Sequence, residues 1–200
     1  LERYGYQTSF IYGGESHFDN MKRFFMNKGF QTVVDENDYG RPTFVGSWGV
    51  SDEDLFDRAH ETFSQSGEQP VFSLVFTSSN HSPFDIPAGR VSESEYGPRE
   101  TAIKYADYAL GRYIDMARES SYWDNTIFLI VADHSVRVKG GTLVPVERFR
   151  IPGVILGGDI EPRRIPGISS QIDLVPTLLS LIGLSSEHPG IGRDLTLPEY

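Results

Sequence analysis

An apolar run over residues 126–132 constrains the fold of this chain more than any other feature. It reads Thr-Ile-Phe-Leu-Ile-Val-Ala, is rich in β-branched residues, and stops at Asp133 and His134. Such a run predicts a strand buried on both faces, as in a parallel sheet covered by helices. Because ligands of α/β sheets bind beyond the carboxyl ends of the strands, we expect the chemistry of this chain at these two residues.

The two residues after this run form a mixed pair of potential metal ligands. Asp133 offers a hard anionic oxygen, and His134 offers a neutral nitrogen. This combination suits Zn²⁺ or Mn²⁺ and suits an all-oxygen Ca²⁺ cage poorly. We therefore predict that both side chains bind one divalent ion.

A second apolar run of the same design covers residues 70–77 and precedes His81. On its own, His81 could either stabilise its loop by hydrogen bonds or contact a ligand. A helix predicted from Gly97 to about Ser120 would let the two apolar runs lie parallel, through a right-handed crossover. Two strand–helix units in succession predict an α/β fold with a mainly parallel sheet flanked by helices on both faces.

Weaker signals complete the expected order of elements. The expected elements are a strand at 8–12, a helix at 18–28, a helix from 51 to about 67, an edge strand at 150–156 and a helix at 174–182. In the first of these helices, the apolar face is expected in the core: Phe18, Met21, Phe24 and Phe25. Ser51 and Asp173 are expected to cap the later helices, which explains the acids near residue 52 without a metal.

Composition excludes several classes of function. The formal charge of −10 and the scattered Lys and Arg residues argue against a nucleic-acid partner. No apolar run reaches the roughly 18 to 20 residues of a membrane span, and the absence of cysteine excludes a thiol nucleophile. At 200 residues we expect one domain, and because the chain starts at Leu1 without a Met, we expect a piece of a longer protein.

Two cations follow the predicted ligand pair in a glycine-containing loop. Arg137 and Lys139 could bind an anionic group held near the metal ion. The alternative is that both are solvated surface cations.

Several motifs occur in an order that is typical of one family. They are Tyr12-Gly13-Gly14 with Phe18-Asp19-Asn20-Met21, Ser79-Asn80-His81-Ser82-Pro83-Phe84, Ala132-Asp133-His134, and the stretch 170–179. Together they resemble the C-terminal half of the sulfatase-like catalytic domain of the alkaline phosphatase superfamily. The likeness is closest to lipoteichoic acid synthases and related phosphoglycerol transferases. Residues 1–200 would thus be the C-terminal part of one catalytic domain.

The resemblance implies roles for particular residues. Asp133 and His134 match paired ligands of a catalytic divalent ion, with Mn²⁺ expected first and Zn²⁺, Mg²⁺ or Ca²⁺ as alternatives. His81 matches a histidine that contacts the phosphoglycerol head group. Other head-group positions of the lipoteichoic type are held here by different residues, so the acceptor is left open: Tyr12, Gly14, Asp19 and Met21.

The resemblance also implies a reaction and a location. The parent protein would move a phosphoglycerol-type group from a lipid donor to a hydroxyl acceptor through a covalent threonine intermediate. It would be anchored by N-terminal transmembrane helices, with this domain on the extracytoplasmic side of the bacterial cytoplasmic membrane. The nucleophile and a glutamate ligand are expected upstream of Leu1, so the 200 residues alone are expected to be inactive. The alternatives are a sulfuric ester hydrolase or phosphodiesterase of the same superfamily, and a non-catalytic binding or regulatory domain.

Overall fold

The structure, a computed structural model, forms two compact units, residues 1–123 and 124–200, which are described separately. It describes residues 1–135, 141–143, 145–158, 160–185, 187 and 190–197. Arg137 and Lys139 therefore lie outside the described residues.

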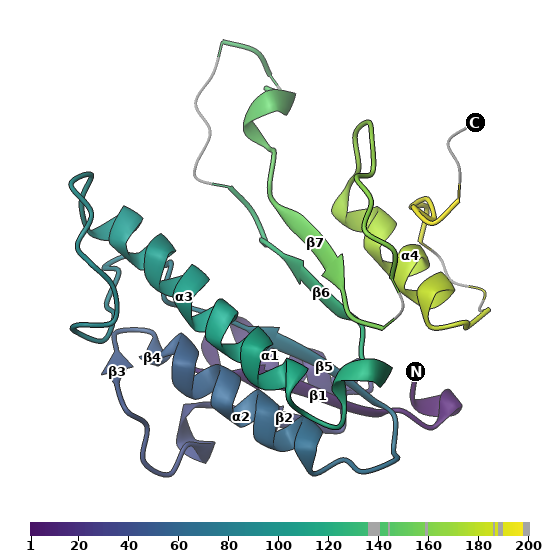
Figure 1. Cartoon of the computed structure of the whole chain (residues 1–200), viewed down its shortest axis with the longest axis horizontal. Coiled ribbons are helices and arrows are strands. Elements are labelled where there is room, and N and C mark those ends of the chain that lie inside the picture. The colour runs from purple at the N-terminus through teal and green to yellow at the C-terminus, as the bar shows by residue number, and fades with distance from the viewer. Residues whose placement is uncertain (136–140, 144, 159, 186, 188–189, 198–200) are drawn as a thin grey trace. The chain divides into compact units, whose positions relative to one another are not determined.

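The first unit is built on a three-stranded parallel sheet with β1 at its centre (Figure 1). β1 (Gln7–Tyr12) pairs on one side with β2 (Thr32–Val34) and on the other with β5 (Val71–Phe76). The last five residues of β1 are buried, as expected of a central strand that is covered on both faces.

Helices cover both faces of this sheet, and the predicted α/β fold class is confirmed. α1 (Met21–Asn27) packs on one face, where Phe25 stacks on Phe10 with 3.9 Å between ring centroids. α2 (Asp52–Ser64) packs on the opposite face. Its contact with the sheet forms a buried cluster of Ile11, Val34, Leu55 and Ala59. Neighbouring residues of β1 thus serve opposite faces, as the alternation along a strand requires.

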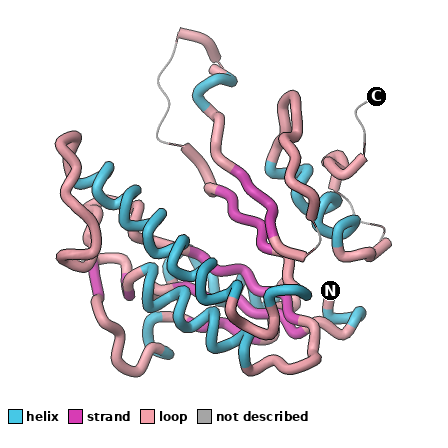
Figure 2. Tube along the Cα trace, in the orientation of Figure 1, coloured by secondary structure: helices cyan, strands magenta, loops and turns pink. Residues whose placement is uncertain are grey.

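The helix predicted from Gly97 is α3 (Pro98–Arg118), which lies beside α2 (Figure 1). Gly97 is its N-cap and Pro98 its first residue, where a missing N–H costs nothing. Phe56 of α2 stacks on Tyr113 of α3 with 5.0 Å between ring centroids. The connection from β5 to α3, which carries His81, contains no helix or strand (Figure 2).

A short hairpin precedes α2. β3 (Val45–Gly46) pairs with β4 (Gly49–Val50) in antiparallel fashion, which leaves Ser47 and Trp48 as the two-residue turn. Neither this hairpin nor β2 was expected from the sequence, because strands of two or three residues are too short to show a period.

The second unit contains an antiparallel strand pair and a helix. β6 (Phe128–Val131) pairs with β7 (Gly153–Leu156), and α4 (Leu174–Leu181) ends before Gly183, whose φ is +70°. The expected parallel arrangement of residues 126–132 with 70–77 stays a prediction, because the two runs lie in different units. None of the described helices combines the length and the apolar character that a bilayer crossing requires.

Two side chains expected in the core are exposed. Phe18 and Phe24 retain 46% and 55% of their accessible surface. The helix begins only at Met21, because Asp19 and Asn20 have left-handed φ values of 47° and 61° that interrupt the helical spacing.

Asp173 was expected to cap α4 through its side chain, and the structure differs on this point. It stands at the N-cap position of α4, but its side chain makes no cap hydrogen bond to that helix. Its carboxylate instead accepts the backbone N–H groups of Ser170 and Arg193, each at 2.8 Å. Asp173 thus ties the start of α4 to the segment near residue 193.

The two-sided core predicts the effect of shortening a central side chain. Ile11→Ala should lower the free energy of unfolding by about 3 kcal/mol, because Ile11 is fully buried between α2 and the sheet. The matched control is Ile103→Ala, at a side chain that is 51% exposed, which should cost under about 1 kcal/mol. Urea denaturation followed by circular dichroism measures both, and equal losses would contradict the described core.

Candidate functional site

Asp133 and His134 lie directly beyond β6 and face solvent together. Their side chains are 57% and 80% exposed, and His134 Nε2 lies 3.3 Å from Asp133 Oδ2. The backbone N–H of His134 donates to Asp133 Oδ1 at 2.8 Å, which orients the carboxylate. A separation of 3.3 Å suits two ligands that each bind one ion at about 2.0 to 2.2 Å.

The ring orientation of His134 fits a metal ligand. Its Nδ1–H donates to the carbonyl oxygen of Ser135 at 2.7 Å, so the neutral imidazole carries its lone pair on Nε2. Metal-binding histidines are usually held in this way, with the second ring nitrogen bonded to a carbonyl or a carboxylate.

Gln171 holds the backbone from which both side chains project. Its Nε2 donates to the carbonyl oxygens of Ala132 at 3.1 Å and Asp133 at 2.8 Å. This role of Gln171 could not be predicted from the sequence, because a glutamine just before a helix start is typical of an ordinary surface position. Among the described residues, no cluster of three or more metal-ligating side chains forms, so this pair would require ligands from elsewhere.

His81 belongs to the first unit and lies in the loop after β5. Its Nδ1–H donates to the carbonyl oxygen of Ser82 at 2.9 Å, and its ring packs against Trp48 with centroids 4.0 Å apart. In the described part of this unit, Nε2 makes no hydrogen bond, and the side chain is exposed. His81 therefore stabilises its own loop through one nitrogen and leaves the other available to a ligand.

Asp52 anchors the start of the His81 loop to the first turn of α2. Its Oδ1 accepts the backbone N–H groups of Ser78 and Ser79, both at 3.3 Å. Ser51 caps the helix as predicted, through its hydroxyl oxygen and the N–H of Asp54 at 3.2 Å. Asp52 was expected only to favour the helix dipole, so its hold on the loop was missed.

The carboxylate of Asp52 is buried, and one of its two oxygens lacks a hydrogen bond within the described residues. Only 1% of the residue is exposed, and its Oδ2 makes no hydrogen bond among the described residues. Burial raises the pKa of Asp52, although hydrogen bonds from Ser79 and Ser78 act in the opposite direction.

Backbone strain in the first unit collects in the two loops that follow β1 and β5. The described non-glycine residues with positive φ are Asp19, Asn20 and Phe84. Such conformations cost free energy and persist only where surrounding contacts impose them, often at functional sites. The residues with positive φ thus lie in the segments beyond the carboxyl ends of β1 and β5, and His81 was predicted at this same edge of the sheet.

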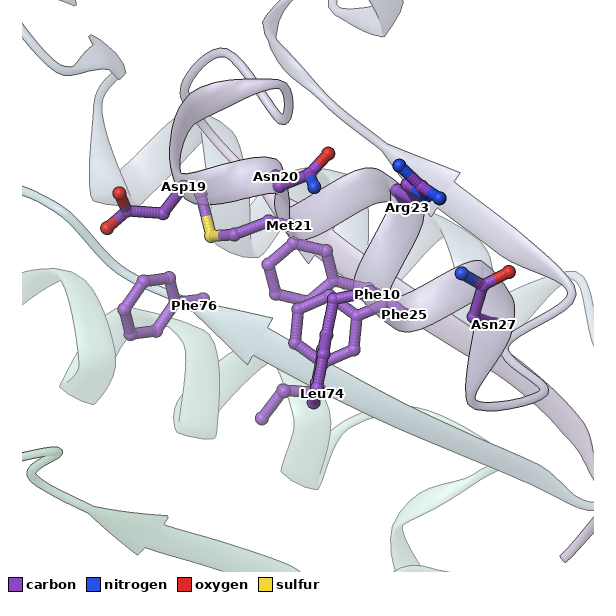
Figure 3. A pocket seen from close by; sticks show the side chains of 10 residues that line it. Phe10, Asp19, Asn20, Met21, Arg23, Phe25, Asn27, Leu74 and Phe76 are labelled. Carbon is purple, nitrogen blue, oxygen red and sulfur yellow. The ribbon is translucent and has the colours of Figure 1, made fainter.

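A pocket of about 530 Å³ lies between α1 and the parallel sheet (Figure 3). Its apolar wall consists of Phe10, Met21, Phe24, Phe25, Leu74 and Phe76, and its polar side chains are Asp19, Asn20, Arg23 and Asn27. In Figure 3 the rings of Phe10 and Phe25 lie against each other at its centre. His81, Asp133 and His134 do not line this pocket, whereas Asp19 and Met21, which stand at head-group positions of the family, do.

Comparisons with known proteins place the chain among sulfatase-like proteins. The sulfatase family model matches residues 1–184. The phosphoglycerol transferase I of Xanthomonas euvesicatoria is 29% identical over 98% of this chain and 30% of its own length.

Two solved structures share the fold. A Vibrio parahaemolyticus protein of the alkaline phosphatase superfamily matches with a TM-score of 0.95 and 55% identity, over 100% of this chain and 50% of its own. The lipoteichoic acid synthase LtaP from Listeria monocytogenes matches with a TM-score of 0.85 and 24% identity, over 98% of this chain and 54% of its own. The chain thus spans about a third of the length of the curated relative and about half of each solved chain.

The buried carboxylate predicts a pH dependence of stability. The ordinary pKa of an aspartate, which applies in the unfolded state, is 3.8. Because the pKa of Asp52 is higher in the folded state, the folded protein keeps this proton at pH values where the unfolded chain has lost it. The contribution of Asp52 is therefore most favourable below pH 3.8 and declines as pH rises through the folded pKa. Asp52→Asn keeps an oxygen for Ser78 and Ser79 and removes this dependence.

We expect the stability difference between Asp52→Asn and the wild type to shift toward the variant as pH rises. The shift should be about 1.4 kcal/mol for each unit by which burial raises the pKa. Urea unfolding at a series of pH values measures it, with Asp115→Asn at a 78% exposed side chain as the control. A difference that does not change with pH would contradict the burial of Asp52.

Proposed function

The chain belongs to the sulfatase family, and on that premise we propose that it forms part of the active site of a metal-dependent phosphoglycerol transferase. The parent protein would move a phosphoglycerol-type group from a lipid-linked donor to a hydroxyl acceptor. A threonine outside residues 1–200 would carry the covalent intermediate. The observation that carries the proposal is the exposed pair of Asp133 and His134, 3.3 Å apart. Similarity to a phosphoglycerol transferase supports the reaction class.

Asp133 and His134 would hold the divalent ion, with Mn²⁺ proposed first and Zn²⁺, Mg²⁺ or Ca²⁺ as alternatives. Bound there, such an ion supplies positive charge to the phosphoryl oxygens and to the attacking oxygen. The carboxylate of Asp133 contributes negative charge, and the bond from His134 Nδ1–H to Ser135 keeps Nε2 available. Gln171 keeps both residues in place through the backbone.

His81, Arg137 and Lys139 are proposed to bind the phosphoglycerol group. The unoccupied Nε2 of His81 can accept a hydrogen bond from a hydroxyl or, when protonated, donate one to a phosphate oxygen. Arg137 and Lys139 would supply charge-assisted hydrogen bonds to the phosphate. Both lie outside the described residues, so their role rests on the sequence alone.

We further propose that residues 1–200 are the C-terminal part of one catalytic domain. The parent would be anchored by N-terminal transmembrane helices, with this domain on the extracytoplasmic side of the bacterial cytoplasmic membrane. The partial coverage of the relatives supports a catalytic domain longer than residues 1–200, since a solved chain of the same superfamily is twice as long as the matched part.

The test is phosphoglycerol transfer by the full-length protein. With Mn²⁺ and a fluorescent lipid that carries a phosphoglycerol head group, Asp133→Ala should lower turnover by at least about 100-fold, because one metal ligand is lost. Asp115→Ala, at another exposed aspartate, should leave turnover unchanged.

Each other outcome of this assay points to an alternative. Full activity in Asp133→Ala would refute the metal pair. Release of the head group to water alone would favour the hydrolase. A protein that binds Mn²⁺ through Asp133 but never turns over would favour the non-catalytic domain.

Gln171, which supports the backbone of the pair without binding the ion, can be tested separately from the two ligands. Gln171→Met should raise the dissociation constant for Mn²⁺ about tenfold, because supporting residues typically affect affinity to this degree. Isothermal titration calorimetry measures it, and Gln65→Met at an exposed glutamine is the matched control. Equal affinities of both variants would show that Gln171 does not orient the pair.

A further inference from the structure

We propose that Trp48 is a positioning residue that fixes the ring orientation and the tautomer of His81, so that Nε2 is presented to the substrate as a hydrogen-bond acceptor. The part that concerns substrate rests on the proposed function. The part that concerns the two side chains rests on contacts within the first unit alone.

One carbonyl oxygen connects the two side chains. Ser82 O accepts the indole Nε1–H of Trp48 at 2.7 Å and the imidazole Nδ1–H of His81 at 2.9 Å. A carbonyl oxygen has two lone pairs, and both are used here. Since a carbonyl can only accept, Nδ1 of His81 must carry the proton, and the neutral ring then has its lone pair on Nε2.

Ring packing adds a second constraint on His81. The indole and imidazole centroids lie 4.0 Å apart at an angle of 51°, so Trp48 covers one side of the imidazole. Phe18 in turn meets Trp48 edge-on, with centroids 5.3 Å apart. Rotation of the His81 ring would therefore break a hydrogen bond and an aromatic contact together.

The backbone around Trp48 is itself held against the end of β1. Trp48 occupies the two-residue turn between β3 and β4, and the next residue, Gly49, has a φ of +103°. A Cβ on Gly49 would lie 2.0 Å from Gly13 O, so no other residue fits there. The N–H of Val50 also donates to Gly13 O at 2.9 Å. The hairpin is thus a rigid support for the indole.

The hairpin is also tied to the far end of the His81 loop. The N–H and hydroxyl of Ser47 donate to Asp85 Oδ2 at 2.9 and 2.6 Å. The hydroxyl of Ser78 donates to Trp48 O at 3.4 Å. With Asp52 at the start, the loop 78–85 is held at both ends and in its middle, and Trp48 makes the middle contact.

This arrangement assigns a specific chemistry to His81. In the tautomer that Ser82 selects, Nε2 can accept a hydrogen bond from a hydroxyl group but cannot donate one to a phosphate unless the ring is protonated. The ligand group expected at His81 is therefore a hydroxyl, such as those of a glycerol moiety, with the phosphate bound by other residues.

The experiment is a long-range ¹H–¹⁵N spectrum of the histidine rings in the 200-residue chain, with His81 assigned through His81→Gln. In the wild type, Nε2 of His81 should resonate as an unprotonated nitrogen. Trp48→Phe keeps an aromatic ring but lacks the indole N–H that holds Ser82 O in place. Without that bond the carbonyl can turn away from Nδ1, and the signals of His81 should shift toward the Nε2–H tautomer. Trp123→Phe, at the other tryptophan, should leave them unchanged.

Two results would overturn the proposal, and neither depends on enzymatic activity. One is an Nε2–H tautomer at His81 in the wild type, and the other is an unchanged tautomer in Trp48→Phe. If that variant does not fold, exchange of the Trp48 indole hydrogen in the wild type decides. We expect exchange at least about tenfold slower than in a free indole, and unprotected exchange would refute the bond to Ser82. Loss of Mn²⁺-dependent transfer in the parent would count against the proposed function and not against this result.

Discussion

The parallel pairing of β1 with β2 and β5 is the constraint on which the first unit depends. A central parallel strand leaves no backbone group to solvent and must be covered on both faces, which α1 and α2 accomplish. Because parallel strands end at the same edge, the turn after β1 and the loop after β5 are brought to the same side. The strained and hydrogen-bonded loops collect there as a consequence.

The loops at this edge are held mainly by polar contacts, and the holding groups come from the chain between the strands. The buried carboxylate of Asp52 binds two backbone N–H groups of the loop after β5. Burial raises the pKa of Asp52, so the ionised form of this side chain carries a cost that its hydrogen bonds to the loop offset only in part. The second unit uses a similar device, since Gln171 binds two carbonyl groups at the end of β6. In both units one side chain near the start of a helix, Asp52 before the loop after β5 and Gln171 beside the end of β6, binds two backbone groups and so holds the loop in place.

Much of the fold could be predicted from the sequence, because long apolar runs and caps are local signals. The start of α3 at Pro98 and the cap at Ser51 followed from residue type and spacing. The pairing of β6 could not be predicted, because an apolar run does not specify which strand will occupy its ladder. The same distinction between local and tertiary signals holds for the candidate site. His134 could be predicted from its place directly after an apolar run. Trp48 could not, because it contacts Ser82, 34 residues away in the chain.

Both candidate histidines stand before a serine and donate Nδ1–H to the carbonyl of that serine, Ser82 for His81 and Ser135 for His134. Each imidazole is thus oriented by its own peptide neighbour, within a segment of two residues. Two side-chain rotations are immobilised before any ligand arrives, so their conformational entropy is not lost on binding. A His-Ser dipeptide after a strand can therefore act as a preorganised ligand, and at His81 the indole of Trp48 adds a tertiary contact that holds the same orientation.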